Sequence, residues 1–401
     1  MSIASQPQVQ PPRIEFPHLD GLRGLAALAV VLYHAFLFTG ASGQAASELP
    51  LVGLVVGWGY LGVPVFIVLS GFLLMLPLLH PEGLRFRGGV RRFIGRRARR
   101  ILPPYYAALI LSLTLIAAVP VLQAPAGTAW DTKIPVTVPS IVSHLLLVHD
   151  LNGAWILNIN GPLWSVAVEW QIYFLLPLLL VPLWRRMRAP AVVVTITAMT
   201  VFVPAVTSVG AMLHPWFVTL FAMGMLAAQV AMGHRESRRT TVVAISAVVA
   251  LMVAAFMLGG DSPSSGLWLS ETVVGIGIAL LLAFTGARVV SGRGFPGGAL
   301  LSSKPFVYAG TVSYSVYLLH SPLLALGNLI LMPVSLPIFE HWLLMTTVVA
   351  PLSVLICWLF YQAVEKRFQN TRQRHISAAS ESLPAIPSAA AGQPTITRAA
   401  D

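Results

Sequence analysis

A chain of 401 residues in which 56% of residues are hydrophobic and 10% are charged has more apolar surface than a soluble domain of this length can bury. The mean hydropathy of +0.79 and repeated apolar runs predict an all-α, polytopic membrane helix bundle in the cell membrane. The net charge of +11 would suit a protein that binds nucleic acid, but the placement of the basic residues argues against such a partner. The single cysteine, Cys357, excludes a disulfide within the chain and any cysteine-based metal cluster, and we expect no metal site.

Ten apolar segments are each long enough to cross a hydrocarbon core of about 30 Å as a helix. The one long connection on the outer side, 123–160, contains a stretch at 139–149 that is apolar but too short to span. We expect this connection either to re-enter the membrane or to cover the site as a lid. The predicted spans, in chain order, are 21–39, 58–79, 101–122, 163–184, 191–210, 214–232, 240–259, 267–287, 306–332 and 341–363.

The basic residues gather on one side of this predicted arrangement. Residues 80–100 alone contain eight arginines, and most of the others follow every second span, whereas the opposite side has only Lys133. Because Lys and Arg concentrate in cytoplasmic segments, the pattern predicts an even number of spans with both termini in the cytoplasm.

The two ends of the chain differ in composition from the membrane-embedded part. Residues 1–13 are polar and rich in Pro and Gln, and residues 371–401 are rich in Ala, Ser and Pro. Segments of this kind bury too little apolar surface to offset the entropy of ordering, so we expect both to be disordered. The start of the chain lacks the basic region of a signal peptide, so we expect no cleaved leader. One membrane domain at 14–370 is therefore predicted.

The first predicted span has an arginine, Arg23, and a histidine, His34, with ten residues between them. At about 1.5 Å and 100° per residue, the two lie roughly 16 Å apart along the axis and near one another in azimuth, so they can face one cavity. Ionisable residues inside a bilayer are costly and usually functional. We expect His34 to act as a general base, whereas Arg23 alone is also explained as an anchor at the inner interface.

The arginine-rich segment ends in Arg96-Arg97-Ala98-Arg99-Arg100-Ile101-Leu102-Pro103. Arginine suits bidentate contact with phosphate, which would hold a phosphorylated donor arriving from the cytoplasm. Attraction to anionic lipid headgroups explains the same density of charge, and the sequence alone leaves both interpretations open.

Later spans contain three further groups with possible chemistry. Glu169 lies about two turns inside one end of its predicted span, and Ser165 shares its face four residues earlier. His320 lies at a depth similar to that of His34, with Tyr317 one turn before it. A partner for an intramembrane cation explains Glu169 as well as a catalytic role does, and interhelical hydrogen bonding is the alternative for His320.

Two other residues attract attention without pointing to a role in the chemistry. Ser70 follows the stretch from Phe66, where packing of small residues explains it, and no base lies beside it in sequence. Glu271 is expected near the outer end of its span, in contact with water.

The combination of motifs resembles the acyltransferase-3 family of integral membrane O-acyltransferases. The resemblance covers about residues 14–370 and preserves the order of the family's motifs. Pro64 departs from it, since relatives often have an acid or a small polar residue there. The matching motifs are Leu19-Asp20-Gly21-Leu22-Arg23-Gly24 with His34, the stretch Phe66–Leu73, Arg97-x-x-Arg100, Trp164-Ser165-x-x-x-Glu169 and Ser313-Tyr314-Ser315-x-Tyr317-Leu318-x-His320.

The resemblance implies an acyl-CoA co-substrate, no permanently bound cofactor and a hydroxyl acceptor on a sugar. The chain resembles the stand-alone branch of the family, whose acceptors include cell-surface polysaccharides and macrolide-type metabolites. It implies that His34 is the base and that Arg23 supports the site. Arg97 and Arg100 would bind the donor phosphates, and we expect Glu169 to orient His34.

Two other classes of protein remain as alternatives. A proton-coupled transporter or lipid flippase also has intramembrane histidines and carboxylates, although the sequence lacks repeat symmetry and paired broken helices. A non-catalytic membrane scaffold would not need buried ionisable side chains.

Overall fold

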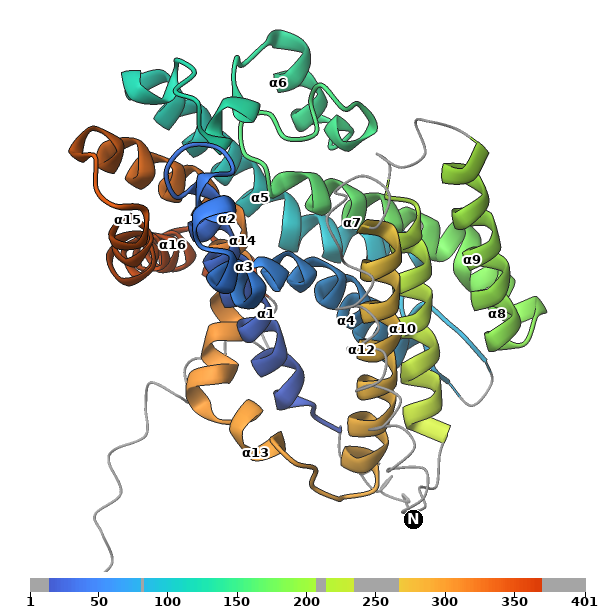
Figure 1. The fold of residues 1–401 in the computed structure, drawn as a ribbon. Helices are drawn as coiled ribbons and strands as arrows, with labels where there is room; N and C mark the ends of the chain where they lie inside the picture. Colours follow the sequence, from blue (N-terminus) through green and yellow to red (C-terminus); the bar gives the residue numbers. More distant parts are fainter. Residues whose placement is uncertain (1–13, 81–82, 207–213, 234–266, 370–401) are drawn as a thin grey trace, which may run out of the picture.

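The computed structural model describes residues 14–80, 83–206, 214–233 and 267–369, and this part of the chain is helical, with no strand (Figure 1). Several α-helices continue through a 3-10 or π turn into the next, as α3 does into α4 and α15 into α16. The α-helices are α1 (Pro17–Phe38), α2 (Gln44–Glu48), α3 (Pro50–Val56), α4 (Gly62–Met75), α5 (Gly89–Ala118), α6 (Val138–Leu145), α7 (Leu163–Leu175), α8 (Val181–Arg186), α9 (Ala189–Val206), α10 (Trp216–Gly233), α12 (Leu267–Val290), α13 (Gly298–Leu301), α14 (Lys304–Leu331), α15 (Ile338–Leu344) and α16 (Ala350–Ala363).

Eight helical segments of the described residues are long and apolar enough to cross a membrane, which confirms the prediction of an all-α, multi-pass membrane protein. The predicted span 191–210 corresponds to α9, and the predicted span 240–259 lies outside the described residues, as do the ends 1–13 and 371–401. The eight segments are Pro17–Phe38, Pro50–Leu78, Gly89–Ala118, Leu163–Arg186, Trp216–Gly233, Trp268–Val290, Lys304–Val334 and Ile338–Arg367.

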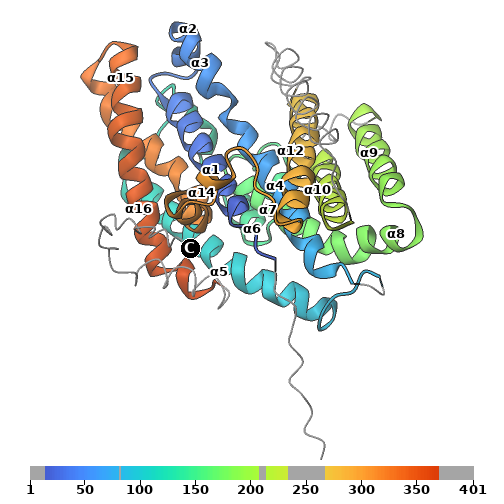
Figure 2. The ribbon, with the colours of Figure 1, turned by 90° about the horizontal axis from the view of Figure 1, so that it is seen from below.

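Helices α1 and α14 form the middle of the bundle, with α15 and α16 on one side and α4, α10 and α12 on the other (Figures 1 and 2). Glycines let α1 and α14 approach until their backbones touch. A Cβ at Gly310 would lie 1.9 Å from the carbonyl oxygen of Asp20, and one at Gly24 would lie 2.7 Å from the nitrogen of Gly310. This close crossing brings together the helices that carry His34 and His320.

A second close crossing joins α4 to α10. A Cβ at Gly71 would lie 2.0 Å from the carbonyl oxygen of Phe221, and one at Gly224 would lie 2.0 Å from that of Val68. Packing of this kind is typical of helices in lipid, where association depends on van der Waals contact rather than on the hydrophobic effect. It fixes the position of α4, which carries Ser70.

The connection between α5 and α7 packs along these two helices rather than above their ends. Tyr105, which is 13 residues before the end of α5 and therefore about 20 Å along it, donates a hydrogen bond of 2.9 Å to the carbonyl of His144. Gln171, within α7, donates to the carbonyl of Leu147 at 3.2 Å. Val138 and Leu146 of this connection are exposed. The arrangement favours the re-entrant alternative over a lid.

Candidate active site

A cavity of about 1090 Å³ enters the bundle between α1, α4, α5, α7 and α14. It brings together six of the eight residues that the sequence analysis singled out, although they come from four helices. Seven further polar or charged side chains line it. The six are Arg23, Arg97, Arg100, Ser165, Glu169 and Tyr317, and the seven are Glu15, Asp20, Ser70, Arg87, Tyr173, Ser313 and Tyr314.

Four guanidinium groups line this cavity, those of Arg23, Arg87, Arg97 and Arg100, together with the carboxylates of Glu15, Asp20 and Glu169. Arg23 Nη1 lies 3.7 Å from a carboxylate oxygen of Asp20, and the two side chains form an ion pair within α1. Arg97 Nε is buried and lacks a hydrogen-bond partner. Arg97 and Arg100 lie on the same face of α5, three residues apart. A site with donors of this kind is suited to phosphate groups.

Glu169 accepts two short hydrogen bonds deeper in the cavity. Ser70 Oγ and Tyr173 OH each donate to Glu169 Oε1 at 2.5 Å. The carboxylate is thereby fixed by α4 and by its own helix, and its charge acts on both Arg23 and Arg97. The partner of Ser70 could not be read from the sequence, because Glu169 is 99 residues away. The structure pairs Glu169 with Ser70 and Tyr173, and it does not support the expectation that Glu169 orients His34.

His320, rather than Glu169, is the neighbour of His34. The two imidazole rings lie 4.9 Å apart at an angle of 69°, and Nε2 of His320 is 3.3 Å from Nδ1 of His34. His320 is fully buried and His34 is half-buried. The similar depth that the sequence predicted for the two histidines therefore corresponds to direct contact between them.

The hydrogen bonds of this pair define the tautomers. His34 Nδ1 lies 2.9 Å from the carbonyl oxygen of Val30, and His320 Nδ1 lies 2.8 Å from that of Val316. A carbonyl oxygen can only accept, so in each neutral ring Nδ1 carries the proton and Nε2 has the lone pair. Nε2 of His34 has no hydrogen-bond partner among the described residues, so its lone pair is available to take a proton.

Tyr317 lies between the cavity and the histidine pair. Its ring centroid is 6.0 Å from that of His320, and its hydroxyl makes a hydrogen bond of 2.5 Å with Ser165 Oγ. His34 and His320 themselves do not line the cavity. The arrangement is a cavity lined by arginines and by Tyr317, with His320 next to Tyr317 and His34 in contact with His320.

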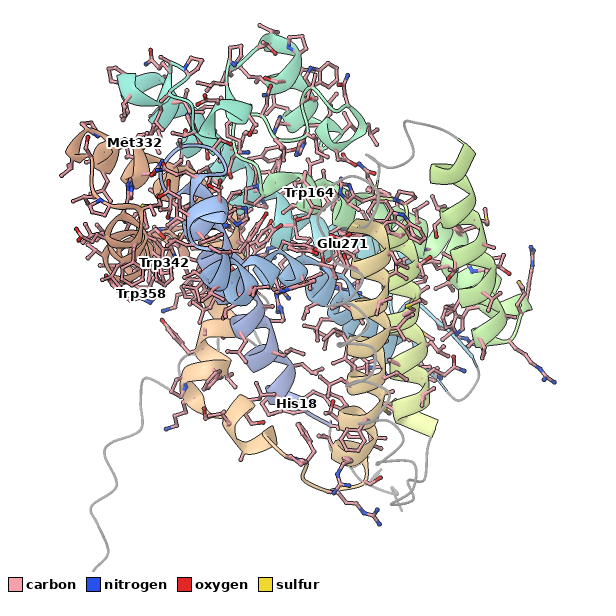
Figure 3. The ribbon with its side chains drawn as sticks, viewed as in Figure 1. His18, Trp164, Glu271, Met332, Trp342 and Trp358 are labelled. Atoms are coloured by element: carbon pink, nitrogen blue, oxygen red, sulfur yellow. The ribbon has the colours of Figure 1, made fainter. Side chains whose placement is uncertain are left out.

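The neighbouring buried acids serve different parts of the bundle. Glu365, which the sequence analysis missed, accepts hydrogen bonds from the backbone nitrogen of Ser315 at 3.0 Å and from Ser315 Oγ. Glu271 is buried and accepts a hydrogen bond of 2.6 Å from Trp216 Nε1, so the expectation that water surrounds it is wrong. Figure 3 shows Glu271 at the end of α12 that lies away from His18.

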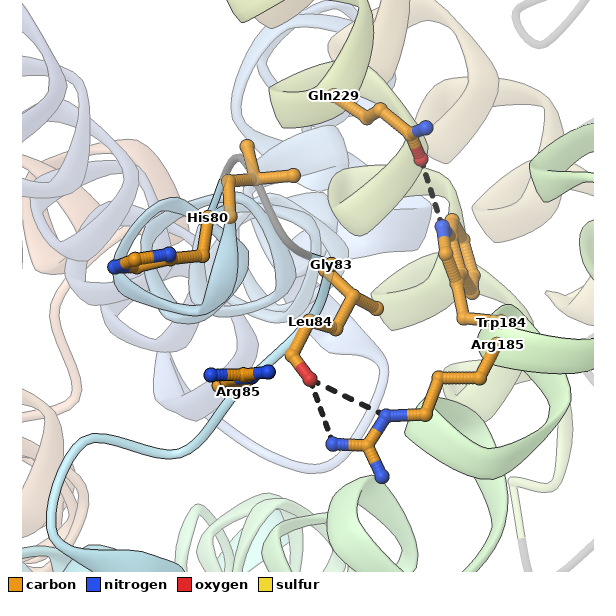
Figure 4. A pocket seen from close by; sticks show the side chains of 8 residues that line it. His80, Gly83, Leu84, Arg85, Trp184, Arg185 and Gln229 are labelled. Atoms are coloured by element: carbon orange, nitrogen blue, oxygen red, sulfur yellow. Dashed lines mark hydrogen bonds between the residues drawn. The ribbon is translucent and has the colours of Figure 1, made fainter.

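A second cavity, of about 710 Å³, lies near α8 and contains none of the predicted site residues (Figure 4). Arg185 donates from Nε and Nη2 to the carbonyl oxygen of Leu84, at 3.2 and 2.6 Å, and Trp184 Nε1 donates to Gln229 at 2.7 Å. The bonds of Arg185 hold the segment before α5 on α8, and the bond of Trp184 holds α8 on α10. We therefore assign these contacts a structural role.

Comparison with protein families agrees with this geometry. The model of the Acyl_transf_3 family, described as an acyltransferase domain, matches residues 16–362. The chain belongs to the acyltransferase-3 family. The matched range includes all four arginines that line the cavity and both histidines.

Several curated proteins are similar to this chain over most of its length. YrhL of Bacillus subtilis, which carries the provisional name of a peptidoglycan O-acetyltransferase, is 26% identical over 90% of this chain and 56% of its own length. The O-acetyltransferase OatA of Staphylococcus aureus is 23% identical over 84% of this chain and 55% of its own. The peptidoglycan O-acetyltransferase OatA of Listeria monocytogenes is 25% identical over 79% and 50%, respectively. The chain thus spans about half the length of these relatives. No solved structure matches it.

Proposed function

We propose that this chain is a membrane O-acyltransferase that moves an acyl group, acetyl in the first instance, from acyl-CoA to a hydroxyl group of a sugar or glycosylated acceptor. The observation that carries the proposal is the arginine-lined cavity that ends next to a pair of buried histidines. Acyl-CoA combines several phosphates with a long flexible arm that ends in a thioester. The cavity offers cations at one end and a basic nitrogen beyond the other.

The donor binds with its phosphates against Arg97 and Arg100, with Arg23 beside them. Arg97 Nε is buried without a partner, and a bound phosphate would supply the missing acceptor. The acyl end of the donor reaches toward Tyr317. Glu169 offsets part of the charge of Arg23 and Arg97, and it holds Ser70 and Tyr173 in the cavity wall.

His34 is the general base in this proposal. Its Nε2 accepts the proton of the acceptor hydroxyl while Nδ1 remains bonded to the carbonyl of Val30. His320 is a positioning residue, because its Nε2 faces the Nδ1 proton of His34 and stabilises the imidazolium that forms.

The chemical step follows from this placement. The acceptor oxygen forms a bond to the thioester carbonyl carbon as its proton passes to His34, and the carbon–sulfur bond then breaks. The thiolate leaves toward the arginine side, and a proton from His34 neutralises it. Apolar residues around the pair, such as Phe66 and Phe38, exclude water that would otherwise hydrolyse the donor.

The acceptor class is proposed from the relatives. Two of them are named for peptidoglycan, so a cell-surface polysaccharide is the first acceptor to test. A macrolide-type acceptor rests only on the resemblance to the stand-alone branch and is the second. With the arginines at the cytoplasmic face, the acceptor approaches His34 from the opposite side of Tyr317.

The proposal is tested with purified protein in lipid vesicles, labelled acetyl-CoA and a panel of glycan and macrolide acceptors. Transfer of label to a hydroxyl ester, lost on mild alkaline treatment, is the expected result. Proton-coupled flux of an acceptor or lipid across the vesicle membrane, with no ester formed from any donor and acceptor, would overturn the proposal in favour of a transporter.

A further inference from the structure

Lys133 is the only basic residue of the long connection between α5 and α7, and it is buried inside the bundle with 7% of its surface exposed. It ends the 3-10 helix Ala129–Lys133, which packs against both α1 and α14. Its carbonyl accepts a hydrogen bond of 2.9 Å from Ile159, and a Cβ at Gly161 would lie 3.0 Å from its Cε. The lysine stem is therefore enclosed on all these sides.

The segment around Lys133 is attached to the helix of the second histidine. Asn160 Nδ2 donates to the carbonyl oxygen of Leu318 at 2.8 Å and to Ser112 Oγ at 3.0 Å. Leu318 follows Tyr317 directly and precedes His320 by two residues. Lys133 is thus held at the part of α14 that carries the proposed site.

The ammonium group of Lys133 has no anion beside it in the described ranges. Its single hydrogen bond, of 2.6 Å, goes to Thr132 Oγ1. Asp131, the nearest acid in sequence, instead accepts from the backbone nitrogens of Ala126 and Gly127 at 3.1 and 2.9 Å. Burial lowers the pKa of Lys133 to about 8, so Lys133 is protonated in most molecules at neutral pH. Two ammonium protons remain without an acceptor.

The charge of Lys133 lies within reach of the proposed base. Lys133 and His320 are the two titratable groups whose charges act on His34. The charge of Lys133 acts on His34 from α1. Helix α14, which also packs against this 3-10 helix, carries His320, and Asp131 and Thr132 belong to the lysine's own element. None of the four is a carboxylate in contact with the ammonium.

We propose that the Lys133 ammonium stabilises the negatively charged oxygen that forms on the acyl carbonyl during transfer, and this rests on the function proposed above. As the acceptor oxygen bonds to the carbonyl carbon and its proton passes to His34, the carbonyl electron pair moves onto the carbonyl oxygen. That oxygen accepts hydrogen bonds from Lys133. When the carbon–sulfur bond breaks, the pair returns to form the ester carbonyl and the thiolate leaves.

If Lys133 had a purely structural role, we would expect an anion beside its ammonium group. A buried charge without a counter-ion destabilises the folded state, so a lysine kept only for packing would be paired or replaced by an apolar residue. An oxygen that becomes negative only in the transition state explains why the resting site contains no anion.

The test compares Lys133→Met and Lys133→Arg with a matched control, Lys304→Met, which removes an exposed lysine from the start of α14. We expect Lys133→Met to lower kcat for acetyl transfer to a neutral sugar by about 100-fold or more, with little change in either KM. Its thermal stability should equal or exceed that of the wild type, and Lys304→Met should keep full activity.

The pH profile supplies a readout that a structural role would not change. In the wild type, kcat should fall as pH rises through about 8, because Lys133 then loses its proton. Arg stays protonated above pH 12, so Lys133→Arg should retain its own, lower rate at high pH. Full activity of Lys133→Met, or a loss confined to the KM of an anionic acceptor, would overturn the proposal. A wild type that transfers no acyl group would refute the proposed function itself.

Discussion

Nε2 of His320 lies 3.3 Å from Nδ1 of His34, across the contact between two helices whose backbones touch at Gly310. The close crossing and the histidine pair are one feature, because side chains at this depth meet only when the helix axes are unusually near. His34 keeps its second nitrogen unbonded, and His320 is bonded through both of its nitrogens. This asymmetry assigns different roles to two residues of the same type.

Replacing His34 with Ala should reduce acetyl transfer to the background, because of the two paired histidines only His34 has an unbonded ring nitrogen. The loss should appear in kcat, and donor affinity should change little, since the arginines line the cavity and His34 does not. Initial rates with labelled acetyl-CoA measure the first, and equilibrium binding measures the second. Size-exclusion chromatography in detergent checks that the variant folds, and substantial activity in a folded variant would remove His34 from the mechanism.

His320→Ala should lower kcat by a smaller factor, about 10- to 100-fold, because it removes the support of the base and not the base itself. The informative measurement is the kcat of the double variant that combines His320→Ala with His34→Ala. Residues that act as a unit are strongly non-additive, so the double variant should be no slower than His34→Ala alone. Independent, multiplying losses would show that His320 acts in a separate way.

Arg97→Gln and Arg100→Gln should each raise the KM for acetyl-CoA by about 10-fold and leave the KM for the acceptor unchanged, because removing one charge-assisted phosphate contact costs about 1.5–3 kcal/mol. Arg99→Gln is the matched control. Arg99 lies between them in sequence, is exposed and does not line the cavity. If all three variants behaved alike, the arginines would serve the membrane surface rather than a donor.

The sequence predicted the class of fold and most of the cavity because both depend on patterns along the chain. Apolar length gives the spans, and the positions of Arg23 and His34 on one helix follow from the helical repeat. Contacts between helices were not predictable in this way. Ser70 meets Glu169 across 99 residues, and only the packing of α4 against its neighbours brings them together.

One local contact could have been predicted from the sequence, and the burial of Lys133 could not. Tyr173 is four residues after Glu169 on the same helix face, so their hydrogen bond follows from helical spacing. Lys133 looked like an ordinary residue of an outer loop. Re-entry of the connection was one of two alternatives, but nothing in the sequence around Lys133 indicates that its ammonium is enclosed in the bundle.

Gly310→Ala should destabilise the protein more than a methyl group added at an exposed position of α14 would. The new Cβ would lie 1.9 Å from the carbonyl of Asp20, so α1 and α14 would have to separate. Overpacking of this kind costs about 1–3 kcal/mol and should also lower activity by displacing His34 from His320. Gly57→Ala is the control, because a Cβ there meets nothing within 4 Å. Thermal unfolding in detergent should show a lower midpoint for Gly310→Ala only.

The stability of the protein should depend on pH through Lys133. Burial disfavours its ammonium form, so its pKa is about 8 in the folded state against 10.5 for the ordinary side chain. Between these values the unfolded chain binds more protons than the folded chain, and the free energy of unfolding therefore rises with pH. Below pH 8 the full cost of the buried charge is present.

Lys133→Met removes this cost at every pH. At pH 7 the variant should unfold at a higher temperature than the wild type, and the difference should shrink as pH rises from 8 to 10. Lys304→Met, whose charge is exposed, should follow the wild-type curve throughout. A variant that is less stable than the wild type at pH 7 would mean that Lys133 supports the fold. The lysine would then have an anionic partner that the described residues do not provide.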